Sequence, residues 1–238
     1  MVDGAIGMAY SLFATSVLLS LGVLPATASA SVHIAEVFTT GASRLAHWRL
    51  GNVRRDLVLR LAVPGVLGGA LGAYVLVETP TTMVRVFVSV YLLCLGGIIL
   101  LKAMRPQPLA AVRPASQVGV LGFCGGLLDA IGGGGWGPIV TSTLIARGSV
   151  PREAIGSASL AEFFVTTAVS ATFVTMIGVS LWPIITGLVL GGVLAAPFAA
   201  LVTQRLPTQP LMIIVGVVIS LLALRGLLAS LRTLVGES

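Results

Sequence analysis

Long runs of apolar residues without charge recur along the chain. Leu61–Val77, Val86–Leu101 and Leu206–Leu224 contain no Asp, Glu, Lys or Arg. About 17–25 such residues form a helix that crosses a bilayer. Transmembrane β-strands instead alternate polar and apolar residues, and these runs do not alternate. The pattern therefore predicts eight apolar helical segments, at about residues 4–22, 26–47, 57–77, 82–103, 115–147, 152–177, 182–203 and 207–231.

The composition supports an all-α membrane protein. Of the 238 residues, 56% are hydrophobic and only 9% are charged, which is too little charge for the surface of a soluble domain. The net charge of +6 fits Lys and Arg that flank membrane helices on the cytoplasmic side better than it fits nucleic-acid binding. Cys94 and Cys124 lie in apolar segments and indicate neither a disulfide framework nor a metal site.

The two halves of the chain resemble each other. Residues 3–40 align without a gap with residues 129–166, and thirteen of these 38 positions are identical. A lipid-like composition would give shared Ala, Leu and Gly, but the identities also include an Asp, a Glu, a Pro, two Ser and two Thr. Such internal repeats are common in secondary transporters. We predict a first transmembrane repeat over residues 1–103, a basic, Pro-containing linker over 104–114 and a second repeat over 115–238.

The fifth segment is too long for one straight crossing, which needs only about 20 residues. It is interrupted by Asp129 and the glycine run Gly132–Pro138. Two half-helices that fold back near mid-membrane explain this length, and they make the repeats inverted, with seven to eight transmembrane segments and broken or re-entrant helices. Basic residues divide 11 to 3 between inside and outside for inverted repeats and 10 to 4 for parallel ones, so the positive-inside rule supports both. We favour the inverted arrangement.

The glycine run is the first candidate site. Non-helical backbone inside a membrane survives only where protein or a water-filled cavity satisfies its polar groups. Consecutive glycines let the chain turn and expose amides, and the half-helix that begins near Pro138 has an N-terminus that favours an anion. The alternative is a close helix–helix crossing through small residues. The predicted anion-binding residues here are Gly132, Gly133, Gly134, Gly135 and Trp136, together with Tyr10 in the weaker counterpart loop Gly4–Tyr10.

A polar stripe on the second segment is the second candidate. Its members recur every three or four residues and so share one helical face: Ser29, His33, Glu36, Thr40, Ser43 and His47. The sixth segment carries a shorter version, Ser159, Glu162, Thr166 and Ser170.

Ionisable residues at membrane depth are costly and normally face the bundle interior. Glu36, Glu162 and His33 are therefore candidates for carrying a coupled proton, although each Glu could instead cap the amides of its own glycine-rich loop. Ser31, Thr40, Ser157 and Thr166 would add hydroxyl donors to the anion site.

Other chemistries have less support. No further His, Cys or Asp joins His33 and Glu36 at ligand spacing, so we predict no metal site and no cofactor. Ser43 and His47 share a helix face, but neither an oxyanion-hole motif nor an orienting acid accompanies them, so we expect no enzyme. The alternative to a proton-coupled transporter is a channel that conducts the anion without coupling.

In combination, these motifs resemble the sulfite exporter TauE/SafE family. The matching pieces are Gly4–Tyr10, Leu24–Pro25, Ser29–His33, Ala35–Thr40, His47–Val53, Ile131–Pro138 and Gly156–Phe164, and the resemblance covers nearly the whole chain. It implies a secondary carrier that exports sulfite or a small organosulfonate, such as sulfoacetate, across a bacterial cytoplasmic membrane. A different small carboxylate or sulfur oxyanion stays open as the substrate. The implied partners are the anion and membrane lipid, without nucleic acid, and a homo-oligomer is left open.

Overall fold

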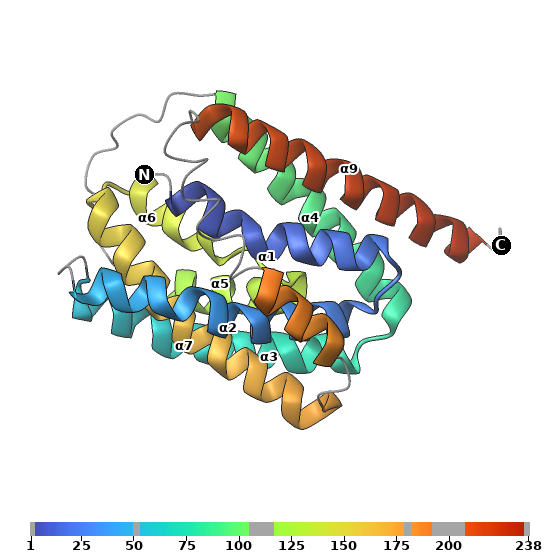
Figure 1. Ribbon diagram of the computed structural model, residues 1–238, viewed down its shortest axis with the longest axis horizontal. Coiled ribbons are helices and arrows are strands. Elements are labelled where there is room, and N and C mark those ends of the chain that lie inside the picture. The colour runs from blue at the N-terminus through green and yellow to red at the C-terminus, as the bar shows by residue number, and fades with distance from the viewer. Residues whose placement is uncertain (1–2, 50–52, 105–116, 179–181, 192–207, 236–238) are drawn as a thin grey trace.

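The computed structural model describes residues 3–49, 53–104, 117–178, 182–191 and 208–235, and every regular element within them is a helix (Figure 1). The all-α prediction is confirmed for this part of the chain. The helices are α1 (Asp3–Ser20), α2 (Pro25–Arg49), α3 (Arg55–Glu78), α4 (Thr81–Met104), α5 (Val118–Gly132), the π-helix η1 (Gly137–Thr141), α6 (Ser142–Ala146), α7 (Pro151–Ile177), a short helix over Trp182–Gly191, and α9 (Thr208–Val235).

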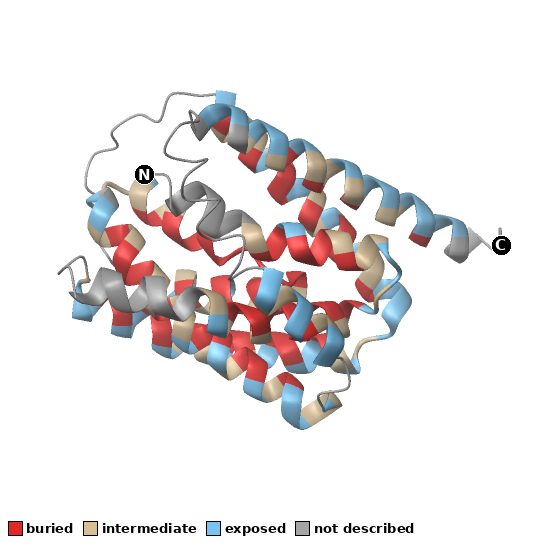
Figure 2. Ribbon diagram, in the orientation of Figure 1, coloured by how far each residue is buried: buried red, intermediate tan, exposed pale blue. Residues whose placement is uncertain are grey.

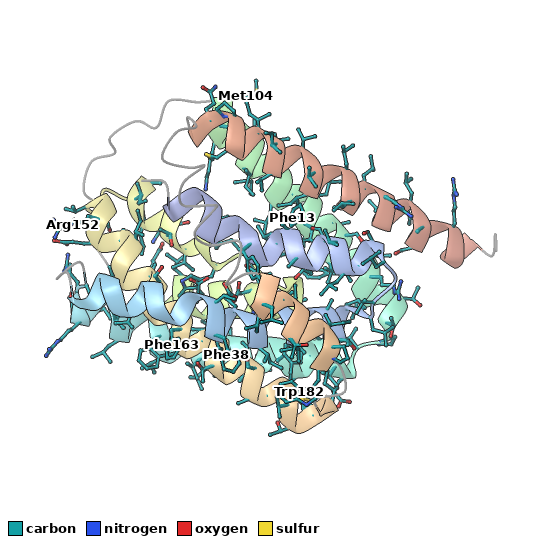
Figure 3. The ribbon with its side chains drawn as sticks, in the orientation of Figure 1. Phe13, Phe38, Met104, Arg152, Phe163 and Trp182 are labelled. Atoms are coloured by element: carbon teal, nitrogen blue, oxygen red, sulfur yellow. The ribbon has the colours of Figure 1, made fainter. Side chains whose placement is uncertain are left out.

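Four described helices are long and apolar enough to cross a bilayer: Arg55–Glu78, Thr81–Met104, Arg152–Ile177 and Met212–Arg232. The helices α3, α4, α7 and α9 that contain them begin within two residues of the predicted positions. Large apolar side chains cover much of the outer surface, among them Phe38, Met104 and Trp182, which are exposed and drawn in Figure 3. Such a surface is unfavourable in water and carries no such penalty in lipid.

The helices α3 and α5 cross closely through glycines. A Cβ atom on Gly122 would overlap the Leu61 carbonyl, and one on Gly126 would overlap the Gly65 carbonyl. Small residues let two backbones approach and pack in this way. Because residue numbers rise together along both helices, α3 and α5 run in the same direction. The least exposed residues gather where α3, α5 and α7 meet, whereas α9 is largely exposed (Figure 2).

The interrupted fifth segment folds back on itself. The helix α5 ends at Gly132, and η1 and α6 return alongside it, so that a Cβ on Gly125 would overlap the side chain of Val140. At the open end of this hairpin, Arg147 Nη2 donates to Gln117 Oε1 at 3.1 Å. The segment therefore begins and finishes at the same end of the bundle, and the helix is broken where the glycine run predicts.

The matching segment of the first half differs. Residues Gly4–Tyr10 belong to α1, which is helical from Asp3, so the expectation of a second glycine loop is wrong. Gly4 and Gly7 are isolated between residues that tolerate a helix, and a single helical glycine costs only about 0.5–1 kcal/mol relative to Ala. Four consecutive glycines, by contrast, favour a break.

Two further expectations fall partly outside the described residues. Of the predicted linker 104–114, only Met104 is described. Of the predicted segment 182–203, the structure describes the helix Trp182–Gly191.

Candidate functional site

The loop between α5 and η1 has a backbone shape that requires glycine. The φ angles of Gly133, Gly134 and Gly135 are +67°, +140° and +134°, which residues with a side chain rarely adopt. Space is also lacking, because a Cβ on Gly133 would overlap the Thr15 side chain and one on Gly135 would overlap the Tyr91 hydroxyl. Conformation and packing therefore both favour glycine here.

Side chains from α1 and α4 hold the carbonyl groups around this loop. Thr15 Oγ1 donates to the Gly133 carbonyl at 2.5 Å, and the Tyr91 hydroxyl donates to the Gly134 carbonyl at 3.0 Å. Lys102 Nζ donates to the Pro138 carbonyl at 3.1 Å. A break in a helix leaves carbonyl groups without intrahelical partners, and Thr15 and Tyr91 satisfy two of them, those of Gly133 and Gly134.

Asp129 accepts hydrogen bonds from amides of the loop. Its backbone carbonyl accepts from the Gly134 N–H at 2.9 Å, and its side-chain Oδ1 accepts from the Trp136 N–H at 2.9 Å. The residue is almost fully buried. A carboxylate is favoured at a helix N-terminus by the free N–H groups and the helix dipole. The negative group at this N-terminus is thus supplied by the protein's own Asp129.

His33 on α2 pairs with the other oxygen of this carboxyl group. Its Nε2 lies 3.1 Å from Asp129 Oδ2, and the ring is fully buried. Its Nδ1 lies 2.8 Å from the Ser29 carbonyl, and a carbonyl can only accept, so Nδ1 must carry hydrogen. Oδ1 already accepts from Trp136. Without a proton between them, Nε2 and Oδ2 would both be acceptors, so their contact holds one proton. Gain or loss of a proton would change the charge of this buried pair by one unit.

Other residues of α2 lie close to the His33–Asp129 pair, and we call this group, together with the glycine loop, the glycine-loop cluster. Ser29 Oγ donates to the Ala130 carbonyl at 2.6 Å, which ties α2 to the end of α5. Glu36 follows His33 by one turn and is only 2% exposed. The ring centroid of Phe173 on α7 lies 6.5 Å from that of His33. The face of α2 that carries the polar stripe therefore points into the bundle over this stretch.

Trp136 connects the loop to α7. Its Nε1 donates to the Ala158 carbonyl at 3.0 Å, and its ring is buried. Glu162 follows Ala158 by one turn and is half-buried. Two further hydroxyls on this helix, those of Thr166 and Ser170, are buried and have no hydrogen-bond partner among the described residues. Such a group costs about 1–3 kcal/mol when left unsatisfied, so it is a place where a ligand or water would be stabilised.

Three predicted anion-site residues make hydrogen bonds elsewhere. The Ser31 hydroxyl donates to the Thr27 carbonyl of its own helix at 2.8 Å. The Ser157 hydroxyl accepts from the Arg54 N–H at 2.9 Å, where α3 begins. The Tyr10 hydroxyl donates to a carbonyl in the helix Trp182–Gly191 at 3.1 Å. The side chains of Thr40, Ser43 and His47 lie outside the described residues.

Four residues whose side chains hydrogen-bond to the loop or to η1 were not among the predicted site residues: Thr15, Tyr91, Lys102 and Asp129. Asp129 had the clearest signal, because it is a charged residue inside an apolar segment directly before the glycine run. Thr15 is identical to its repeat counterpart Thr141, which was a weaker signal. Tyr91 had none, because its role depends on how α4 packs against the loop.

Comparisons with known proteins agree with this architecture. The family model described as sulfite exporter TauE/SafE matches residues 1–226. The probable membrane transporter protein YtnM of Bacillus subtilis (strain 168) is 38% identical over 245 residues, in an alignment that covers 100% of this chain and 79% of that protein. No solved structure gives a significant match. Together with the apolar helices, these matches identify a multi-pass membrane transporter, and the chain belongs to the sulfite exporter TauE/SafE family.

Proposed function

We propose that this protein is a secondary transporter that exports a small anion, sulfite or a small organosulfonate, with coupling to protons. The observation that carries the proposal is the buried His33–Asp129 pair at the break between α5 and η1. Ionisable residues inside membrane proteins mark ion pathways and proton relays, and discontinuous helices mark transporter binding sites. Here both features occur at the same place.

The proposed architecture is a pair of inverted repeats in the cytoplasmic membrane. The repeat partners α2 and α7 run in opposite directions (Figure 1). The helices α4 and α9 are also antiparallel, because Gly96 packs beside Ser220 while Ser89 packs beside Gly226. Opposite directions of equivalent helices are what an inverted repeat requires.

The basic residues orient the bundle in this proposal. Where α3, α5 and α7 begin, the chain carries Arg54, Arg55, Arg60, Arg147 and Arg152. Where α4 begins and α9 ends, it carries Arg85, Arg225 and Arg232. By the positive-inside rule, the end with more basic residues faces the cytoplasm.

We place the anion between α2 and α7, beside the glycine loop. Thr39 on α2 and Thr166 and Ser170 on α7 have buried hydroxyls without partners among the described residues, and an anion would accept hydrogen bonds from them. The Gly134 amide donates to the Asp129 backbone carbonyl and the Trp136 amide donates to the Asp129 carboxyl group, so only the Trp136 amide becomes available to the anion when that carboxyl group moves away.

The charge of the His33–Asp129 pair then couples proton to anion. With one extra proton the pair is positive, which attracts an anion at short range in a medium of low dielectric constant. Loss of that proton restores the carboxylate and returns the pair to zero net charge, so the attraction for the anion is lost. Glu36, buried one turn after His33, and Glu162 on α7 would accept or supply the proton. In this scheme the proton and the anion bind and move together, so export runs down an outward gradient of the anion and is not driven by the inward proton gradient.

Coupling can be separated from simple conduction by the membrane potential. An anion moving alone gains or loses about 2.3 kcal/mol per elementary charge for each 100 mV. A monoanion that moves with one proton carries no net charge, so its flux does not depend on the potential. The test substrate is isethionate, whose sulfonate group stays ionised near neutral pH and so carries no proton of its own.

The experiment uses purified protein in liposomes with a clamped potential and an internal pH dye. We expect isethionate flux to be accompanied by protons, to vary little with potential, and to lose its proton component in Asp129→Asn. Thr175→Ala, an exposed position on α7, is the matched control and should behave as wild type. Potential-driven flux without protons would mean a channel, and an absence of flux with sulfite, isethionate and sulfoacetate would exclude the substrate class.

A further inference from the structure

A pocket of about 380 Å³ lies between the end of α1, the beginning of α4 and the end of α9. It is distinct from the glycine-loop cluster. On α1, Thr15 contacts the glycine loop, whereas Leu19, one turn later, lines the pocket. On α4, Tyr91 reaches the loop, whereas Ser89 lines the pocket. The pocket therefore extends away from the loop toward the opposite end of the bundle, and it begins about one helical turn beyond the loop contact on α1 and about half a turn beyond it on α4.

Two guanidinium groups line this pocket. Arg85 comes from α4 and Arg225 from α9, and no Asp or Glu is among the lining residues. Within the described part of the chain, neither arginine forms an ion pair with a carboxylate. Two like charges that converge without a counterion are unfavourable, so an anion between them would be stabilised.

The hydrogen bond made by Arg85 leaves most of its donors available. Its Nη2 donates to the Gly22 carbonyl at 3.3 Å, just past the end of α1. A cation is favoured beside a helix C-terminus, and this contact fixes the position of the side chain. A guanidinium has five N–H donors in a fork that matches the oxygens of a carboxylate, sulfonate or phosphate group, so one weak bond does not exhaust it.

Hydroxyl groups complete the lining. Ser89 is 5% exposed, and in the described residues its hydroxyl has no hydrogen-bond partner. Ser230, which also lines the pocket, does donate to the Gly226 carbonyl at 2.8 Å. Gly226 permits this close packing, because a Cβ there would lie 3.2 Å from Ser89 Oγ. A buried hydroxyl that faces a pocket without a partner is available to a ligand in that pocket.

We infer that this pocket is a second anion site, which binds a compact oxyanion group through Arg85, Arg225 and the Ser89 hydroxyl. The ligand chemistry is a sulfonate, sulfate or phosphate group. It can be a free solute or the headgroup of an anionic lipid, because both present the same oxygens to the guanidinium forks. Binding here does not depend on the proposed coupling at the glycine loop.

The first arm of the test measures binding of free anions. Purified full-length protein in detergent is titrated calorimetrically with inorganic sulfate and inorganic phosphate at constant ionic strength. We expect Arg225→Gln to weaken binding at least ten-fold and Arg85→Gln/Arg225→Gln to abolish it. Arg232→Gln, on the same helix but outside the pocket, should bind as wild type. The Arg225 side chain is exposed, so the single variant should fold.

The second arm measures lipid. Protein reconstituted with equal phosphatidylglycerol and phosphatidylcholine is re-extracted, and the retained lipid is identified by native mass spectrometry. Retention of phosphatidylglycerol that is lost in Arg225→Gln but kept in Arg232→Gln assigns the pocket to lipid, and calorimetric binding assigns it to a free anion. The inference is overturned if neither ligand binds the wild-type protein, or if Arg225→Gln binds both as tightly as the wild type. Transport that continues in Arg225→Gln would leave the proposed function intact, so the two proposals fail separately.

Discussion

At the scale of single residues, Asp129 joins three parts of the molecule. Its side chain accepts from the Trp136 amide and meets the His33 ring of α2, while its carbonyl holds the Gly134 amide. Removing one member of such a buried cluster costs more than its net contribution, because the remaining groups stay desolvated and unpaired. Stability and the proposed proton coupling can nevertheless be separated at this position.

Replacing Asp129 by Asn should preserve the hydrogen bonds and remove the charge. The Asn Oδ1 can still accept from Trp136, and its amide can donate to the neutral Nε2 of His33. We expect Asp129→Asn to stay within about 1 kcal/mol of the wild-type unfolding free energy while losing proton coupling. Asp129→Ala should cost about 2–4 kcal/mol, since it removes a helix cap and leaves buried donors unsatisfied.

Chemical unfolding in detergent, followed by the flux assay, checks both variants. Equal destabilisation in Asp129→Asn and Asp129→Ala would contradict this separation, because it would mean that the charge itself holds the loop.

At the scale of elements, the crossing of α3 and α5 depends on specific glycines. A Cβ on Gly126 would overlap the Gly65 carbonyl, whereas one on Gly119 of the same helix would have its nearest neighbour at 3.8 Å. We expect Gly126→Ala to destabilise the protein by about 1–3 kcal/mol through overpacking. Gly119→Ala should be neutral or stabilising by up to about 1 kcal/mol, because Ala is the better helix former.

Thermal unfolding in one detergent compares the pair. Equal melting temperatures for Gly126→Ala and Gly119→Ala would show that the two helices are not held together at Gly126.

The elements were more predictable than the contacts between them. Apolar runs set the long helices, because a segment without charge has few alternatives to a helix in lipid. The break at Gly132–Gly135 was also predictable from the local sequence, because consecutive glycines favour a break in a helix. The helical state of Gly4–Tyr10 did not, since isolated glycines are compatible with either a loop or a helix.

The contacts of the candidate site also fall into those that the sequence predicted and those that it did not. The stripe on α2 predicted which face of the helix points inward, and His33 and Glu36 are buried there. The sequence could not reveal that the Asp129 side chain meets His33, because that contact depends on how α2 packs against the folded-back segment. Nor could it place Tyr91, whose contact with Gly134 joins residues 43 positions apart.

At the scale of the whole molecule, the fold-back of α5 through α6 decides the topology. If residues 118–146 enter and leave at one end, α7 begins at the end of the bundle where its repeat partner α2 finishes, so the two run in opposite directions and the halves are inverted. The hydrogen bond between Arg147 and Gln117 puts both ends of the hairpin together. Thr82, at the beginning of α4, belongs to the opposite end of the bundle, where it lines the pocket with Arg85 and Arg225.

Cysteine labelling in intact bacterial cells tests this topology. The free cysteines Cys94 and Cys124 are both exposed, so they are first replaced by Ser. In that background we expect a membrane-impermeant maleimide to label Thr82→Cys from outside and to label Gln117→Cys and Arg147→Cys only after permeabilisation, because the positive-inside rule places the basic end of the bundle in the cytoplasm. Labelling of Gln117→Cys and Arg147→Cys from opposite sides would mean that the segment crosses the membrane and that the repeats are parallel. Labelling of both from outside would keep the hairpin and reverse the orientation of the bundle.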